Sequence, residues 1–166
     1  MRNFAIITTL TVLAGLAGCA ALFAPPPQPG EPVAAVTAKL GRPGAVYQID
    51  GDSVLEYATG PYGQYTYMAR IGADGRLRSY EQVLTSEKFA TLKVGRATKQ
   101  DVLRTIGRPA ETSYLSLSDL EVWSYRYKES GVWDSMMHVH FDRAGMVRML
   151  MNGPDPLHEE RRGQFR

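Results

Sequence analysis

An internal repeat is the sequence feature that most constrains the fold of this chain. Residues 36–43 (VTAKLGRP) match residues 102–109 (VLRTIGRP) at an offset of 66. Two further pairs follow in the same order: residues 55–57 with 123–125 at an offset of 68, and residues 71–77 with 141–147 at an offset of 70. Three landmarks in one order predict two tandem copies of a single structural unit, with small insertions in the second copy.

Alternating apolar and polar side chains predict the strands of each copy. In the second copy, the apolar members are Trp123, Tyr125 and Tyr127, then Met137, Val139 and Phe141, then Val147 and Met149. The first copy repeats the pattern at Leu55 and Tyr57, at Tyr65, Tyr67, Ala69 and Ile71, and from Leu77 onward. Asp74-Gly75 is a hairpin-turn dipeptide between the last two segments. A three-stranded antiparallel meander is therefore predicted in each copy.

Capping residues predict short helices before the strands. Thr98 is a good N-cap with Asp101 at the N3 position, and Gly107 ends that helix before Pro109. A shorter helix precedes it, starting at residues 85–86, and the first copy has a helix over about residues 32–40. The predicted fold class is α+β: two tandem repeats, each with one or two short helices packed on a three-stranded antiparallel meander.

The N-terminus has the pattern of an export signal. Arg2 precedes an apolar run over residues 4–17, which is shorter than the roughly 20 residues of a spanning helix. The run ends in Leu-Ala-Gly before Cys19, the single cysteine of the chain, and this resembles the lipobox of bacterial lipoproteins. The resemblance implies that Cys19 carries a lipid and that Ala20 behind it favours the outer membrane. The alternatives are an ordinary secretory signal or a transmembrane helix.

These features divide the chain into five expected parts. They are a lipoprotein signal peptide (1–18), a lipid anchor and proline-rich tether (19–32), the first repeat (33–84), the second repeat (85–152) and a flexible tail (153–166). Prolines crowd the tether and favour extended backbone. The net charge of +2 falls to about +1 without Arg2, so the composition does not indicate a nucleic-acid partner.

The second repeat resembles a known family. Residues 93–109 (KVGRATKQDVLRTIGRP), the Trp-Ser-Tyr of residues 123–125 and the hairpin of residues 140–147 resemble the SmpA/OmlA, or BamE-like, domain. The resemblance covers about residues 89–150, and the first half resembles a degenerate second copy. It implies a non-enzymatic outer-membrane lipoprotein, facing the periplasm, that binds other proteins of the β-barrel assembly machinery or supports envelope integrity. The second copy and the charged tail depart from the family.

An alternative function follows from the tandem arrangement. Two copies in one chain also resemble the secreted β-lactamase-inhibitor proteins, which implies a periplasmic protein that binds or inhibits an enzyme. Neither resemblance implies a cofactor. The residues themselves carry no Gly-x-Ser-x-Gly elbow, no phosphate loop and no complete calcium loop, so we expect no enzymatic activity.

Four residues are the best candidates for contacts with a partner. Tyr62 and Trp133 lie in segments predicted as loops, where aromatic side chains often anchor interfaces. His138 and His140 share one face of a predicted strand and form part of a polar outer surface. With a third ligand the two imidazoles could hold zinc, which leaves a metal-binding envelope protein as a third hypothesis. Tyr65 and Tyr67 are expected to be core residues.

Overall fold

The computed structural model describes residues 25–60 and 62–158. Two four-stranded antiparallel sheets and three short helices make up this part of the chain, which confirms the α+β class. The elements are α2 (Val33–Leu40), β1 (Ala45–Ile49), β2 (Asp52–Ala58), β3 (Thr66–Ile71), β4 (Leu77–Gln82), α3 (Ser86–Thr91), α4 (Lys99–Ile106), β5 (Glu111–Leu115), β6 (Leu120–Glu129), β7 (Trp133–Phe141) and β8 (Val147–Pro154).

Each sheet has four strands, so the prediction of three-stranded meanders is wrong in this detail. The additional strands are β1 and β5, which form the first edge of each sheet. Every residue of β5 is exposed, and Val46 in β1 is exposed as well. β5 therefore carries no apolar alternation, and in β1 the exposed Val46 between the partly buried Ala45 and Tyr47 hides it, so the sequence pattern indicated neither strand.

The two sheets share strand order, register and one irregularity. Glu56 pairs with Met68 in the first sheet, and Ser124 pairs with His138 at the equivalent place in the second. A register shift follows Arg70 in β3 and follows His140 in β7. A bulge at the same point of both meanders bends them alike, so that equivalent residues face equivalent directions.

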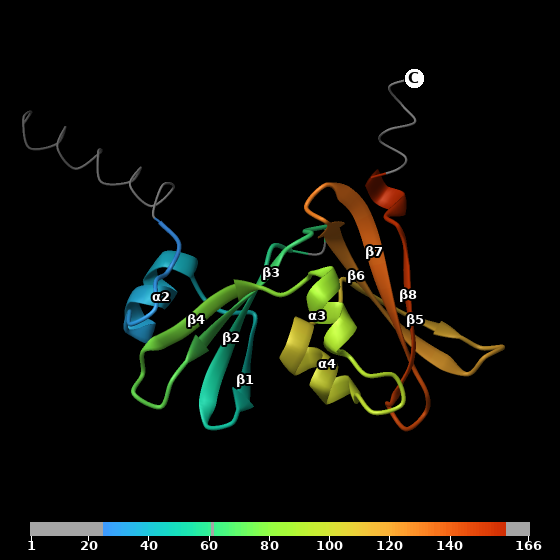
Figure 1. Cartoon of the computed structure of the whole chain (residues 1–166), viewed down its shortest axis with the longest axis horizontal. Helices are drawn as coiled ribbons and strands as arrows, with labels where there is room; N and C mark the ends of the chain where they lie inside the picture. The colour runs from blue at the N-terminus through green and yellow to red at the C-terminus, as the bar shows by residue number, and fades with distance from the viewer. Residues whose placement is uncertain (1–24, 61, 159–166) are drawn as a thin grey trace, which may run out of the picture.

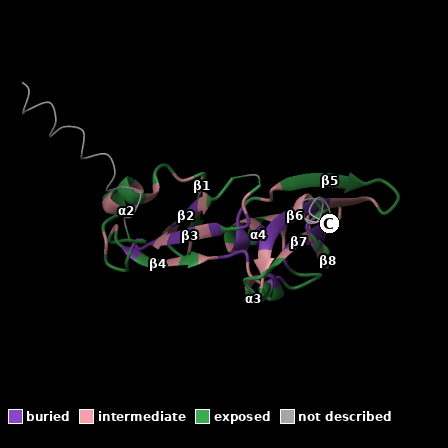
Figure 2. Ribbon diagram, turned by 90° about the horizontal axis from the view of Figure 1, so that it is seen from above, coloured by how far each residue is buried: buried purple, intermediate pink, exposed green. Residues whose placement is uncertain are grey.

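Helices and sheets alternate as layers along the long axis of the molecule (Figure 1). The order is α2, the first sheet, α3 with α4, and the second sheet. Val36 of α2 packs on β2, β3 and β4, while the other face of the first sheet carries a small separate cluster of Val54, Met68 and Val83. The largest cluster joins α3 and α4 to the second sheet through Phe89, Leu92, Val102, Ile106, Trp123, Tyr125, Val139 and Phe141. The buried residues lie mainly on the strands of the two sheets (Figure 2).

The predicted helix ends are confirmed. Thr98 and Asp101 form a reciprocal capping box at the start of α4, and Thr85 caps α3. Gly41 and Gly107 follow α2 and α4 at φ of 79° and 81°, a left-handed region that glycine enters without steric cost.

Two expectations about exposure differ from the structure. Tyr65 is 39% exposed and precedes β3 rather than forming part of the core, whereas Tyr67 is half-buried and stacks on Tyr80 with ring centroids 5.1 Å apart. The tail was expected from residue 153, but β8 continues to Pro154 and Asp155 is fully buried.

The proposed signal peptide and Cys19 lie outside the described residues, as does the end of the tail. Within residues 25–60 and 62–158, no helix is long and apolar enough to cross a membrane.

Candidate functional site

A buried carboxylate joins the two halves of the molecule. Glu56 on β2 is completely buried and accepts two hydrogen bonds from Arg108, one from the backbone N–H at 3.2 Å and one from Nε at 3.1 Å. The Tyr47 hydroxyl donates a third hydrogen bond to Glu56 at 2.5 Å. A buried charge is tolerated only with such partners, so these three residues fix how α4 meets the first sheet.

The surroundings of Glu56 are tightly packed. A Cβ atom at Gly107 would lie 2.9 Å from Oε2 of Glu56, so the end of α4 approaches the carboxylate as only glycine allows. Burial, together with the hydrogen bond to Glu56, raises the pKa of Tyr47 far above its ordinary value. Burial also raises the pKa of Tyr125, whose hydroxyl donates to the Gly107 carbonyl. Both phenols therefore remain protonated donors.

A cavity of about 280 Å³ lies between the halves, beside Glu56 and Arg108. Arg126 on β6 lines it, and the Arg126 side chain is only 7% exposed. Its Nη2 atom lies 2.5 Å from Glu111, and its Nε atom lies 3.4 Å from the buried carboxylate of Asp155. Among the described residues, Nη1 of Arg126 has no hydrogen-bond partner. A buried donor without a partner is costly and marks a place where an acceptor would bind favourably.

Asp134 connects the halves at a second point. Its Oδ1 atom accepts hydrogen bonds from Gln64 and from Lys128, both at 2.6 Å. Burial acts to raise the pKa of Asp134, but the hydrogen bonds from Lys128 and Gln64 outweigh it and lower that pKa. The contact from Gln64 brings the loop before β3 to the start of β7.

Tyr62 and Trp133 both lie on the surface of this second junction. Tyr62 is 71% exposed in the loop that contains Gln64, and Trp133 is 59% exposed next to Asp134. Trp133 was expected in a hairpin loop, but it is the first residue of β7 and pairs with Glu129. The strand extends further because β6 and β7 continue to pair almost to their turn.

His138 and His140 lie on the sheet face opposite α3 and α4, as the alternation predicted. His138 shares a hydrogen bond of 2.8 Å with the Ser124 hydroxyl, and His140 is only 5% exposed. The alternation suggested that His140 lies on an exposed polar surface, but its side chain is buried and cannot contact a partner directly. In the described part of the chain, no group of three or more His, Cys, Asp or Glu side chains is placed to hold a metal ion.

Both histidines make stability depend on pH. Burial lowers the pKa of His138 and of His140, and for His140 the neighbouring His138 contributes to the shift. The unfolded state therefore takes up protons first as the pH falls below the ordinary histidine pKa of about 6.5, and the free energy of unfolding decreases. We expect His140→Gln to reduce this decrease between about pH 7.5 and pH 5.5, measured by chemical unfolding at several pH values. Equal pH slopes for both proteins would contradict the assignment.

The charged residues at the junction were not identified from the sequence. Glu56 and Arg126 were visible as charges inside strands that otherwise bury apolar groups, and Arg108 belongs to the repeated Gly-Arg-Pro block. A strand pattern shows that a charge lies on the second face of a sheet. It does not show that another layer covers that face and buries the charge.

A comparison with protein families matches the second half of the chain. Residues 81–150 match the family model for the outer membrane protein assembly factor BamE domain, and this segment is a BamE-like domain. The match covers 70 of the 166 residues of the chain. No curated protein matches the chain.

One solved structure resembles the chain weakly. It is a DUF4309 family protein (YjgB) from Bacillus subtilis, 15% identical, with a TM-score of 0.30, and the match covers 72% of this chain and 74% of the other. A similarity at that level supports no conclusion about function.

Proposed function

We propose that this protein is a lipid-anchored, non-enzymatic factor that binds other proteins during the assembly of β-barrel proteins in the outer membrane, or that maintains the envelope. The observation that carries the proposal is the BamE-domain match over residues 81–150. That segment includes α3, α4 and nearly all of the second sheet, which together hold the largest hydrophobic cluster. It therefore contains a folding unit with its own core rather than an isolated motif.

The anchor is a proposal from the N-terminal sequence. Small residues before Cys19 and the apolar run that precedes them support cleavage at Gly18 and lipidation of the cysteine, with the protein on the periplasmic side of the outer membrane. Each buried lipid methylene contributes about 0.8 kcal/mol, so two or three acyl chains hold a protein stably on a bilayer.

Replacement of the anchor residue tests this part of the proposal. We expect Cys19→Ser to yield protein that is either unprocessed or released from the membrane, because no thiol remains to accept the lipid. Fractionation of the envelope with intact-mass measurement of the protein checks this. A Cys19→Ser protein that still carries lipid and stays in the outer membrane would contradict the anchor.

We further propose that residues 33–84 are a degenerate copy of the same domain. Equal strand order, equal register and the bulge at Arg70 and at His140 support this relation. The first half then adds one further helix, α2, and one further sheet, β1–β4, to the molecule.

The partner surface that we propose includes Tyr62 and Trp133, which are exposed at the junction of the halves, and the partly exposed His138 on the face of the second sheet opposite α3 and α4. His140, being buried, contributes by supporting that face. Affinity purification of a C-terminally tagged protein from solubilised outer membranes, with mass spectrometry, tests the function. Recovery of the barrel-assembly proteins in comparable amounts supports the proposal. Recovery of a different envelope enzyme without that machinery would support a tandem-domain binder or inhibitor instead.

A further inference from the structure

The segment that leads into α2 is the structural equivalent of the segment that leads into α4. In each half, this segment lies antiparallel to the last hairpin of the sheet and is joined to it by backbone hydrogen bonds of 2.7–3.0 Å. The bonded pairs are Gly30 with Leu77, Leu77 with Glu31 and Val33 with Gly75 in the first half, and Gly95 with Val147, Val147 with Ala97 and Lys99 with Gly145 in the second. Pro27 and Leu92, each three residues before the first of these glycines, are both buried. Equivalent positions are therefore occupied as far back as Pro27.

In the second half, α3 precedes this segment and packs on the sheet. Phe89 of α3 is only 2% exposed, and its ring centroid lies 6.2 Å from that of Tyr125 and 4.9 Å from that of Tyr127. Met137 belongs to the same hydrophobic cluster, and Leu150 packs against it. A short helix with one aromatic side chain thus completes the core of this half.

The corresponding place in the first half is a groove. Tyr57, Tyr67 and Tyr80 are only partly buried, and they line a hollow of about 510 Å³ beside the end of α2, which we call the tyrosine groove. Strand register makes these residues equivalent to members of the cluster around Phe89: Tyr57 to Tyr125, Tyr67 to Met137 and Tyr80 to Leu150. Within residues 25–60 and 62–158, no helix precedes α2, so α3 has no counterpart there.

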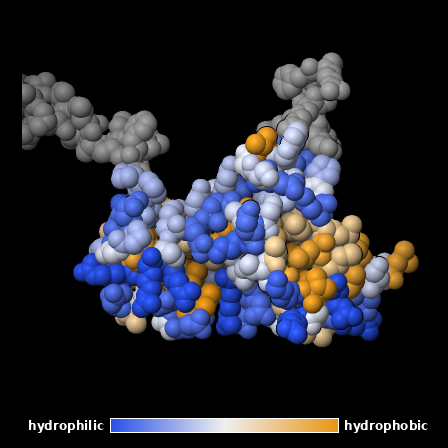
Figure 3. Space-filling model, in the orientation of Figure 1, coloured by the Kyte–Doolittle hydropathy of each residue, from blue (hydrophilic) through white to orange (hydrophobic). Residues whose placement is uncertain are grey.

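The sequence that precedes the described residues contains a match to α3. Phe23-Ala24 stands 66 positions before Phe89-Ala90, which is the offset that relates the two Gly-Arg-Pro blocks. Phe23 lies seven residues before Gly30, and Phe89 lies six residues before Gly95, so the length of chain to the shared hydrogen bonds is nearly equal. Residues 20–24 (AALFA) are all apolar, whereas the first half is mainly hydrophilic on the side shown in Figure 3. The tyrosine groove therefore suits this segment in both chemistry and position.

We propose that residues 20–24 of this chain dock in the tyrosine groove, with the ring of Phe23 against the tyrosine rings as Phe89 lies against Tyr125. The docked segment takes the place in the first half that α3 takes in the second. The consequence for the membrane rests on the proposed anchor. Cys19 precedes Phe23 by four residues, which span at most about 14 Å, so docking holds the lipid close to the groove. The first half then lies against the membrane in one orientation instead of at the end of a free tether.

Site-specific photocrosslinking of the full-length protein in intact membranes tests the inference. Benzoylphenylalanine replaces Phe23, whose aromatic ring it retains, and in a control protein it replaces Val33, which is 37% exposed at the start of α2 beside Gly75. We expect residue 23 to form an adduct within a monomeric chain, which tandem mass spectrometry maps to the tyrosines of the groove, and residue 33 to form no adduct with them. An adduct of residue 23 with lipid or with another protein chain would overturn the inference, as would the lack of any adduct with the groove.

Phe23→Ser gives an independent measurement. It uncovers the tyrosine rings, so the midpoint of thermal unfolding of the purified lipoprotein in detergent should fall by about 3 °C or more. Gln28→Ser changes an exposed residue nearer to α2 and should leave the midpoint unchanged. Equal midpoints for Phe23→Ser and the unsubstituted protein would overturn the inference.

The two measurements separate the docking from the anchor. If Cys19 carries no lipid but residue 23 still crosslinks to the groove, the docking holds and the anchor is wrong. If Cys19 carries lipid but residue 23 forms no adduct with the groove, the anchor holds and the docking is wrong.

Discussion

Trp123→Ala is expected to lower the free energy of unfolding by about 3–5 kcal/mol, because it removes a large side chain from the main hydrophobic cluster. Trp123 is 9% exposed, and its ring centroid lies 4.7 Å from that of Phe141 in an edge-to-face arrangement. The indole Nε1 donates to Glu121 at 2.6 Å. Alanine would therefore leave a cavity, whereas the Glu121 carboxylate, which is 38% exposed and pairs with Lys99, would stay solvated.

Urea unfolding followed by circular dichroism measures this loss. Leu117→Ala is the matched control, since Leu117 is fully exposed at the tip of the β5–β6 hairpin and its removal should change the free energy of unfolding by less than about 0.5 kcal/mol. A loss below about 1 kcal/mol for Trp123→Ala would mean that α3 and α4 cover the opposite face of the second sheet.

Arg108→Met is expected to cost about 2–3 kcal/mol, because it leaves the fully buried Glu56 without its counter-charge. The cost stays below that of breaking a fully buried pair for two reasons. The Arg108 side chain is 53% exposed, and Glu56 keeps hydrogen bonds from the Arg108 backbone and from Tyr47. The halves should separate more readily, since this ion pair connects the first sheet to the end of α4.

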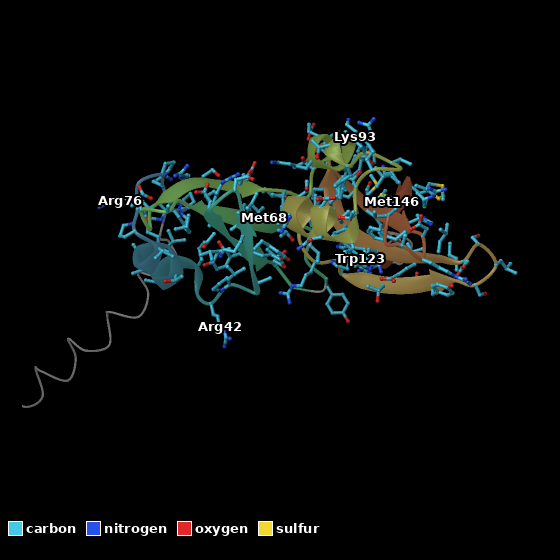
Figure 4. The ribbon with its side chains drawn as sticks, turned by 90° about the horizontal axis from the view of Figure 1, so that it is seen from below. Arg42, Met68, Arg76, Lys93, Trp123 and Met146 are labelled. Carbon is cyan, nitrogen blue, oxygen red and sulfur yellow. The ribbon has the colours of Figure 1, made fainter. Side chains whose placement is uncertain are left out.

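The repeat supplies the matched control for this variant. Arg42 occupies the same position in the first Gly-Arg-Pro block, but it is exposed and projects away from the rest of the molecule (Figure 4). Arg42→Met should therefore leave the unfolding midpoint in urea almost unchanged. Equal effects of the two substitutions would show that the loss comes from the shared motif and not from the ion pair with Glu56.

The polar contacts at the junction also explain why the two halves of the chain form one molecule. Separate hydrophobic clusters serve the two sheets, so apolar packing alone joins them weakly. Glu56 with Arg108 and Gln64 with Asp134 are polar contacts that connect residues more than fifty positions apart. Such contacts need exact geometry, and they hold the layers at a defined orientation.

The sequence alone determined the elements whose signals are local. The capping box at Thr98, the glycines after α2 and α4, and the alternation of Trp123, Tyr125 and Tyr127 each depend on a few neighbouring residues, and the structure confirms them. The repeat also predicted correctly that equivalent strands follow equivalent helices. The edge strand β5 was missed because all of its residues are exposed, and β1 was missed because the exposed Val46 interrupts its alternation with an apolar residue.

Only the tertiary structure decided which faces of the two sheets are covered. Alternation shows that a strand has two different faces, but it does not show what lies against each of them. The stacking of layers buries Glu56 under α4, whereas it leaves Met149 and Met151 exposed on the equivalent face of the second sheet. The physical reason is that burial of a charge, and the partner it then requires, depend on contacts between residues far apart in the chain, and no local pattern encodes these contacts.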